Sequence, residues 1–111
     1  MDKIKVALIG FGRMGEFYLK EMRKSDEWDI AYICDILPAS REYASAVCPG
    51  AKVISDCNEI FSDDSVQAVV LSTLADSRKE LIEKAVSSGK HIIAEKPIAA
   101  SMEDEWEMVR L

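Results

Sequence analysis

The sequence predicts an α/β protein built on a parallel sheet, and three observations carry this prediction. Continuous apolar stretches alternate with stretches of helical periodicity, which is typical of strands buried on both faces and joined by crossover helices. A glycine-rich segment separates the first strand from the first helix. The 111 residues, 49% apolar and 31% charged, suffice for one core but not for two domains. We therefore expect one doubly wound domain over residues 1–111, with about five strands and flanking helices.

The first strand and the first helix meet at these glycines. Residues 4–9 are nearly continuous in hydrophobicity and predict a buried strand that stops at Gly10. Beyond the glycines, helical spacing predicts a helix whose apolar residues are Met14, Phe17, Tyr18 and Met22. We expect Phe17 and Tyr18 to pack in the core rather than to contact a ligand.

The next units are shorter. A strand over 30–34 leads into a helix that begins at Pro38 and carries the apolar stripe Tyr43, Ala44 and Val47. Residues 52–54 predict a short strand, and Asp56 with an acid three positions later predicts the cap of a brief helix. A further buried strand is predicted over 66–72.

The last part of the chain contains the clearest helix signals. Ser77 and Glu80 form a capping-box pattern, Gly89 is placed to end the helix, and the stripe between them is Leu81, Ile82, Ala85 and Val86. Residues 91–94 predict the next strand, 95–97 a turn, and Ser101 the cap of a final helix. No stop signal follows that helix before residue 111, so we expect the domain to belong to a longer two-domain chain.

Composition excludes several classes of function. The net charge of −6 and pI of about 4.8 disfavour binding to nucleic acid or to anionic membranes. The apolar stretches are too short for a membrane span. With one histidine and no paired cysteine spacing, no metal site is expected. The three cysteines (Cys34, Cys48 and Cys57) are expected to be small buried hydrophobes in a reduced, cytoplasmic compartment.

The segment Gly10-Phe11-Gly12-Arg13-Met14-Gly15 has the spacing Gly-x-Gly-x-x-Gly, and its context makes it a dinucleotide fingerprint. It follows a strand, opens a helix, and precedes Asp35 at the end of the second strand. Gly10 would allow the tight turn, Gly12 the approach of a pyrophosphate, and Gly15 close packing of helix on strand. The helix N-terminus would then attract the diphosphate. The alternative is a glycine-rich turn without a ligand.

Charged residues near the fingerprint bear on which coenzyme is bound. Asp35 would accept hydrogen bonds from the adenosine ribose and repel a 2′-phosphate, so we predict that NAD is preferred over NADP. Arg13 either reaches the diphosphate or lies on the surface. Arg41 is expected to be solvated on the next helix rather than to bind a phosphate.

The chain resembles the family of glucose–fructose oxidoreductase, inositol dehydrogenase and MocA over essentially its whole length. The resemblance rests on the fingerprint, on Asp35, on 69–73, on Ser88-Gly89-Lys90-His91-Ile92 and on Glu95-Lys96-Pro97. It implies an N-terminal Rossmann domain, here without its C-terminal substrate domain. It also implies hydride transfer between NAD(P) and a sugar, cyclitol or related alcohol.

The resemblance assigns roles to individual residues. Lys96 would lie beside nicotinamide and substrate as the catalytic residue, and Glu95 would orient it or contact the ribose. His91, at the start of a strand, is expected to be structural. Two positions depart from the family, because Leu74 stands where many members have proline and Arg78 where they have histidine. The predicted coenzyme contacts are Gly10, Phe11, Gly12, Arg13, Met14, Gly15, Asp35, Ser72, Thr73, Glu95 and Lys96.

Two other functions remain open from the sequence alone. One is a free-standing nucleotide-binding or redox-sensing module that acts through a partner protein, and the other is a structural domain with a vestigial fingerprint. For the oxidoreductase, we expect the isolated chain to bind coenzyme without turnover, since a closed cleft with a substrate domain is needed for hydride transfer. Any oligomer is expected to form through the missing domain.

Overall fold

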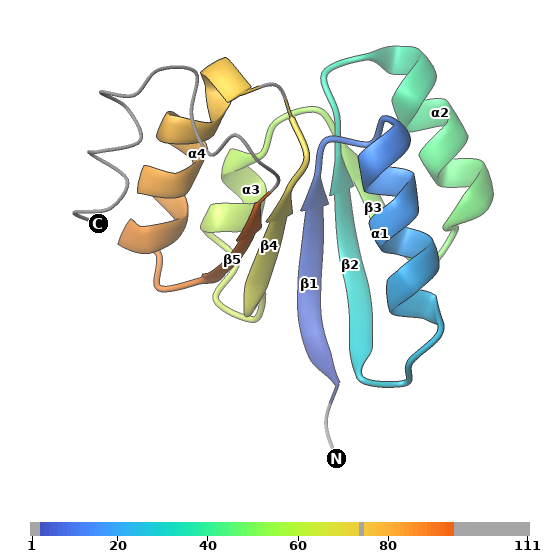
Figure 1. Ribbon diagram of the computed structural model, residues 1–111, viewed down its shortest axis with the longest axis horizontal. Helices are drawn as coiled ribbons and strands as arrows, with labels where there is room; N and C mark the ends of the chain where they lie inside the picture. The colour runs from blue at the N-terminus through green and yellow to red at the C-terminus, as the bar shows by residue number, and fades with distance from the viewer. Residues whose placement is uncertain (1–2, 74, 95–111) are drawn as a thin grey trace.

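A computed structural model describes residues 3–73 and 75–94 of the chain. Their five strands form one sheet in the order β3-β2-β1-β4-β5, and every neighbouring pair is parallel (Figure 1). This confirms the predicted fold class. The elements are β1 (Ile4–Ile9), α1 (Arg13–Arg23), β2 (Trp28–Cys34), α2 (Pro38–Val47), β3 (Lys52–Ile54), α3 (Asn58–Phe61), β4 (Ala68–Leu71), α4 (Ala75–Ser87) and β5 (His91–Ala94).

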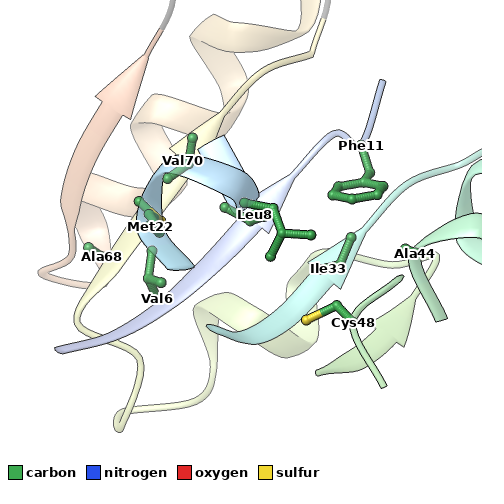
Figure 2. Packing of buried hydrophobic residues seen from close by; sticks show 10 residues of the cluster. Val6, Leu8, Phe11, Met22, Ile33, Ala44, Cys48, Ala68 and Val70 are labelled. Atoms are coloured by element: carbon green, nitrogen blue, oxygen red, sulfur yellow. The ribbon is translucent and has the colours of Figure 1, made fainter. Parts of the chain in front are cut away.

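The sheet buries both faces, and alternate residues of β1 serve different sides. Val6 and Leu8 belong to a cluster that includes Leu19 and Met22 of α1 and Ala44 of α2 (Figure 2). The intervening residues of β1 pack into a second cluster with α3 and α4. Since the four residues 6–9 are 0–3% exposed, the continuous hydrophobicity of this strand follows from cover on both sides.

Several predicted boundaries differ from the structure. β2 begins at Trp28 rather than Ile30, and β4 is confined to Ala68–Leu71 within the predicted 66–72. α4 begins at Ala75, so the capping-box pattern at Ser77 lies inside the helix rather than at its start. Cys57 directly precedes α3 and makes no capping hydrogen bond, whereas Asp56 accepts a hydrogen bond of 3.0 Å from the backbone N–H of Asn58, the contact expected of a capping aspartate. The predicted turn over 95–97 and the helix from Ser101 lie outside the described residues.

Four side chains expected in apolar stripes are exposed. Met14 is 37%, Phe17 49%, Tyr43 46% and Val86 43% exposed. Helical spacing places Phe17 on the face of α1 opposite to its buried residues. Tyr43 and Val86 lie at the edge of the buried stripes of their helices. Tyr18, by contrast, packs against the α1 side of the core as predicted.

The Gly-Lys-His segment builds the turn between α4 and β5. Gly89 adopts φ 74° and donates to the Val86 carbonyl, while Lys90 N–H donates to Ala85, which together form a Schellman motif. The buried Lys90 Nζ donates to the carbonyls of Asp63 and Val66 at 2.8 and 2.9 Å. His91 starts β5 at the amino edge of the sheet, the position we expected for a structural residue. No helix in the described ranges is long and apolar enough to cross a membrane.

Candidate cofactor site

Three strand ends meet at the carboxyl edge of the sheet, where β1 lies between β2 and β4 (Figure 1). The N–H of Gly10 donates to the Cys34 carbonyl at 2.7 Å, and the N–H of Ser72 donates to Ile9 at 3.0 Å. The Ser72 hydroxyl donates to the Gly10 carbonyl at 2.9 Å. The chain departs from β1 toward β2 on one side and reaches β4 on the other, which makes this edge a topological switch point.

The three glycines of the fingerprint occupy different environments. Gly10 has φ 95°, and a Cβ there would lie 2.9 Å from the carbonyl carbon of Ser72. A Cβ on Gly15 would lie 2.3 Å from the Gly10 carbonyl oxygen, so the start of α1 packs directly on the loop. A Cβ on Gly12 would meet nothing within 4 Å. Two glycines are therefore required by the fold itself, whereas Gly12 borders open space.

The N-terminus of α1 borders the same open space. Gly12 is its cap and contributes no side chain, so the amides of the first helical turn are not covered by a capping group. Arg13 and Met14 are exposed beside it. Phe11, which we predicted as a coenzyme contact, has a side chain only 3% exposed that packs in the core, so only its backbone faces the loop. The helix dipole and these amides favour an anion at this position.

Asp35 follows β2 and is bound to the glycine loop. Its Oδ2 accepts the backbone N–H of Phe11 at 2.8 Å, and its Oδ1 accepts that of Leu37 at 2.8 Å. The half-buried carboxylate is therefore held in one orientation by two backbone amides. Each oxygen keeps a further lone pair, which suits a ligand that presents two hydroxyl groups.

Two arginines contact the backbone at the strand ends, which the sequence did not predict. Arg41, expected to be solvated, donates Nη1 to the carbonyls of Asp35 and Ile36, each at 3.0 Å. Arg78 is only 6% exposed and donates Nε and Nη2 to the Thr73 carbonyl at 3.1 and 2.9 Å. A spacing of five to six residues between each arginine and its carbonyl, across a strand exit and a helix start, was the available signal. Leu74, Glu95 and Lys96 lie outside the described residues.

The cysteines are not all equally buried. Cys34 and Cys48 are 4% and 6% exposed, as expected, but Cys57 is only half-buried, because it directly precedes the short helix α3 at the edge of the core. A hydrogen bond from the Cys34 thiol, assisted by the charge of Lys84, lowers the pKa of Cys57 to about 7. The same hydrogen bond, together with burial, raises the pKa of Cys34.

We expect iodoacetamide to alkylate Cys57 well before Cys34 and Cys48 in the folded chain. The thiolate is the reactive form, so the rate should rise as the pH increases through about 7, the pKa of Cys57. Peptide mapping by mass spectrometry between pH 6 and pH 9 measures this, with Cys57→Ser as the control. Equal labelling of the three cysteines, or a midpoint at the ordinary thiol pKa, would contradict the expectation.

A glycine loop at a switch point, a helix N-terminus beside it and a fixed acid on the neighbouring strand define the class of Rossmann dinucleotide-binding domains. The chain matches the family model described as "Oxidoreductase family, NAD-binding Rossmann fold" over residues 4–111. It therefore belongs to the glucose–fructose oxidoreductase, inositol dehydrogenase and MocA family, as the sequence motifs predicted.

Known proteins similar to this chain include dehydrogenases and oxidoreductases. An uncharacterized oxidoreductase of Streptococcus pneumoniae is 38% identical over 96% of this chain and 28% of its own length. The scyllo-inositol 2-dehydrogenase (NADP(+)) of Bacillus subtilis is 29% identical over 94% of this chain and 28% of its own length. The structure of the WlbA dehydrogenase of Bordetella pertussis was solved with NADH and UDP-GlcNAcA. It is 27% identical to this chain, superposes with a TM-score of 0.89, and the match covers 98% of this chain and 34% of that one. The chain thus spans about a third or less of each relative's length.

Proposed function

We propose that this chain is the coenzyme-binding part of a larger oxidoreductase that transfers a hydride between NAD(P) and a sugar, cyclitol or related alcohol. The observation that carries the proposal is the Asp35 carboxylate, locked by the Phe11 amide beside the glycine loop. Family membership and the names of the relatives support the substrate class. The oxidoreductase is favoured over a free-standing module because the family model and the named relatives are oxidoreductases.

The residues present fit a dinucleotide. The open space beside Gly12 allows a pyrophosphate to approach the backbone, and the N-terminus of α1 would neutralise part of its charge. Asp35 would accept the hydroxyls of the adenosine ribose, and Ser72 and Thr73 would lie under the other half of the molecule. Arg13 and Met14, exposed at the first turn of α1, would border the diphosphate.

The bound coenzyme would supply the site that accepts or donates the hydride. Lys96 follows β5 in the sequence, and we propose that its ammonium group exchanges a proton with the substrate oxygen while Glu95 orients it. The fixed loop and Asp35 would hold the dinucleotide so that its reactive ring faces the substrate side. Since hydride transfer needs a substrate domain closed over the coenzyme, we expect the 111-residue chain to bind NADH without turning over a polyol.

We predict that NADH binds more tightly than NADPH, by about tenfold or more, because the fixed Asp35 carboxylate would face the additional phosphate. We expect Arg41 not to reverse this preference, because its Nη1 already donates to the carbonyls of Asp35 and Ile36. Isothermal titration of the purified chain with each coenzyme measures the ratio. Tighter binding of NADPH would refute the preference, and binding of neither would refute the proposed function.

A further inference from the structure

We propose that Arg41 and Arg78 are positioning residues that each align one half of the bound dinucleotide. In this assignment, Arg41 holds the backbone that follows β2 and so positions the adenosine half. Arg78 holds the backbone that follows β4 and so positions the nicotinamide half. The assignment rests on the proposed function and adds to it two residues that touch no reacting atom. It follows from where the two guanidinium groups lie and what they bind.

Arg78 is one of two charged side chains that are buried among the described residues. The other is Lys90, which donates hydrogen bonds to two backbone carbonyls at the opposite end of the sheet. Burying a guanidinium is costly unless hydrogen bonds compensate it. Arg78 directs two N–H groups to one acceptor, the Thr73 carbonyl, at 3.1 and 2.9 Å. This bidentate contact fixes the peptide that leaves β4 toward α4.

The peptide held by Arg78 is in contact with the glycine loop. The Thr73 methyl group would lie 3.1 Å from a Cβ on Gly10, so Thr73 packs against the loop backbone. The following residue, Leu74, does not have the fixed backbone torsion that a proline would provide there. A side-chain clamp on the Thr73 carbonyl therefore supplies order that the local sequence does not.

Arg41 makes the corresponding contact on the other side of β1. From the first turns of α2, its Nη1 bridges the carbonyls of Asp35 and Ile36 at 3.0 Å each. The Asp35 carboxylate is in turn fixed by the Phe11 and Leu37 amides. Arg41 thus orients the backbone of the acid proposed to bind the ribose.

The sheet order separates the two effects. β2 and β4 flank β1, and a dinucleotide bound across a switch point places its two halves over opposite flanks. Asp35, at the end of β2, marks the adenosine side. Thr73, at the end of β4, then lies on the nicotinamide side.

The test compares NADH with ADP-ribose, which contains the adenosine half and both phosphates but no nicotinamide. We expect Arg78→Met to weaken NADH binding about tenfold while ADP-ribose affinity stays within about twofold of the wild type. Arg41→Met should weaken the binding of NADH and of ADP-ribose by a similar factor. Arg78→Lys and Arg41→Lys each retain one charged donor group and should restore part of the lost affinity. If the methionine variants fail to fold, the lysine variants are compared with the wild type instead.

Isothermal titration gives the dissociation constants, and circular dichroism with thermal melts verifies that each variant is folded. Equal loss of both ligands in the folded Arg78 variants would overturn the assignment of this residue to the nicotinamide half, as would no loss at all. Equal affinity of the wild type for NADH and ADP-ribose would overturn it as well. A wild-type chain that binds neither ligand would instead refute the proposed function.

Discussion

Gly12→Ala is expected to weaken NADH binding about a hundredfold while leaving the domain folded. The added methyl group meets nothing within 4 Å, so it creates no clash in the protein itself. It occupies the space through which a pyrophosphate would approach the loop backbone. The less favourable cap should cost at most about 1 kcal/mol of stability. Titration with NADH and a thermal melt measure the two effects separately.

Gly15→Ala is the matched variant from the same loop, and its main effect should be on the stability of the fold. Its Cβ would lie 2.3 Å from the backbone oxygen of Gly10, so α1 has to move away from the loop. We expect a loss of about 3 kcal/mol or more and a melting temperature lower by about 10 °C or more. If folded Gly12→Ala bound NADH with unchanged affinity, the coenzyme would not bind at this loop as proposed.

Replacing Asp35 by alanine should affect both folding and coenzyme choice. The Phe11 and Leu37 amides lose their acceptor, and the partly buried Phe11 amide should account for most of a destabilisation of about 1–3 kcal/mol. NADH affinity should fall about tenfold or more as the ribose hydroxyls lose the carboxylate. NADPH should lose much less, because the same substitution removes the repelling charge.

Asp35→Asn separates charge from hydrogen bonding at this position. Its amide keeps one acceptor for a backbone N–H but carries no charge, so it should be more stable than the alanine variant while still favouring NADPH relative to wild type. Titrations with both coenzymes and chemical denaturation test this pair of variants. An unchanged ratio of NADPH to NADH affinity in both would show that Asp35 does not choose the coenzyme.

The centre of the sheet was predictable because β1 and β4 are buried on both faces. Residues 4–9 and 68–71 have continuous apolar patterns that need no information about their neighbours. The glycine loop and Asp35 could also be predicted from the sequence. The positive φ of Gly10 and the close packing of Gly15 on the Gly10 carbonyl depend on local geometry, which the glycine spacing reveals. The apolar stripes were overestimated at Phe17 and Val86, because the side that a helix presents to the sheet depends on how the helix is rotated about its axis.

The arginine contacts were missed, because the shared spacing of five to six residues does not by itself distinguish an arginine that binds a strand end from a solvated one. Arg41 and Arg78 look like solvated helix residues, and their acceptors are backbone carbonyls, which leave no residue-type signal. Only the packing of α2 and α4 against the sheet brings each guanidinium to a strand end. The half-buried state of Cys57 has the same origin, because it depends on the short helix α3 lying at the margin of the core.

The hydrogen bonds of Gly10 and Ser72 extend the pattern of the sheet into the loop that would receive the coenzyme. Gly10 donates to the end of β2, and Ser72 donates to the end of β1. Because these bonds form with the sheet, the loop loses its conformational entropy when the domain folds rather than when a ligand arrives. A dinucleotide would then meet a rigid receptor, and little of its binding free energy would be needed to order the protein.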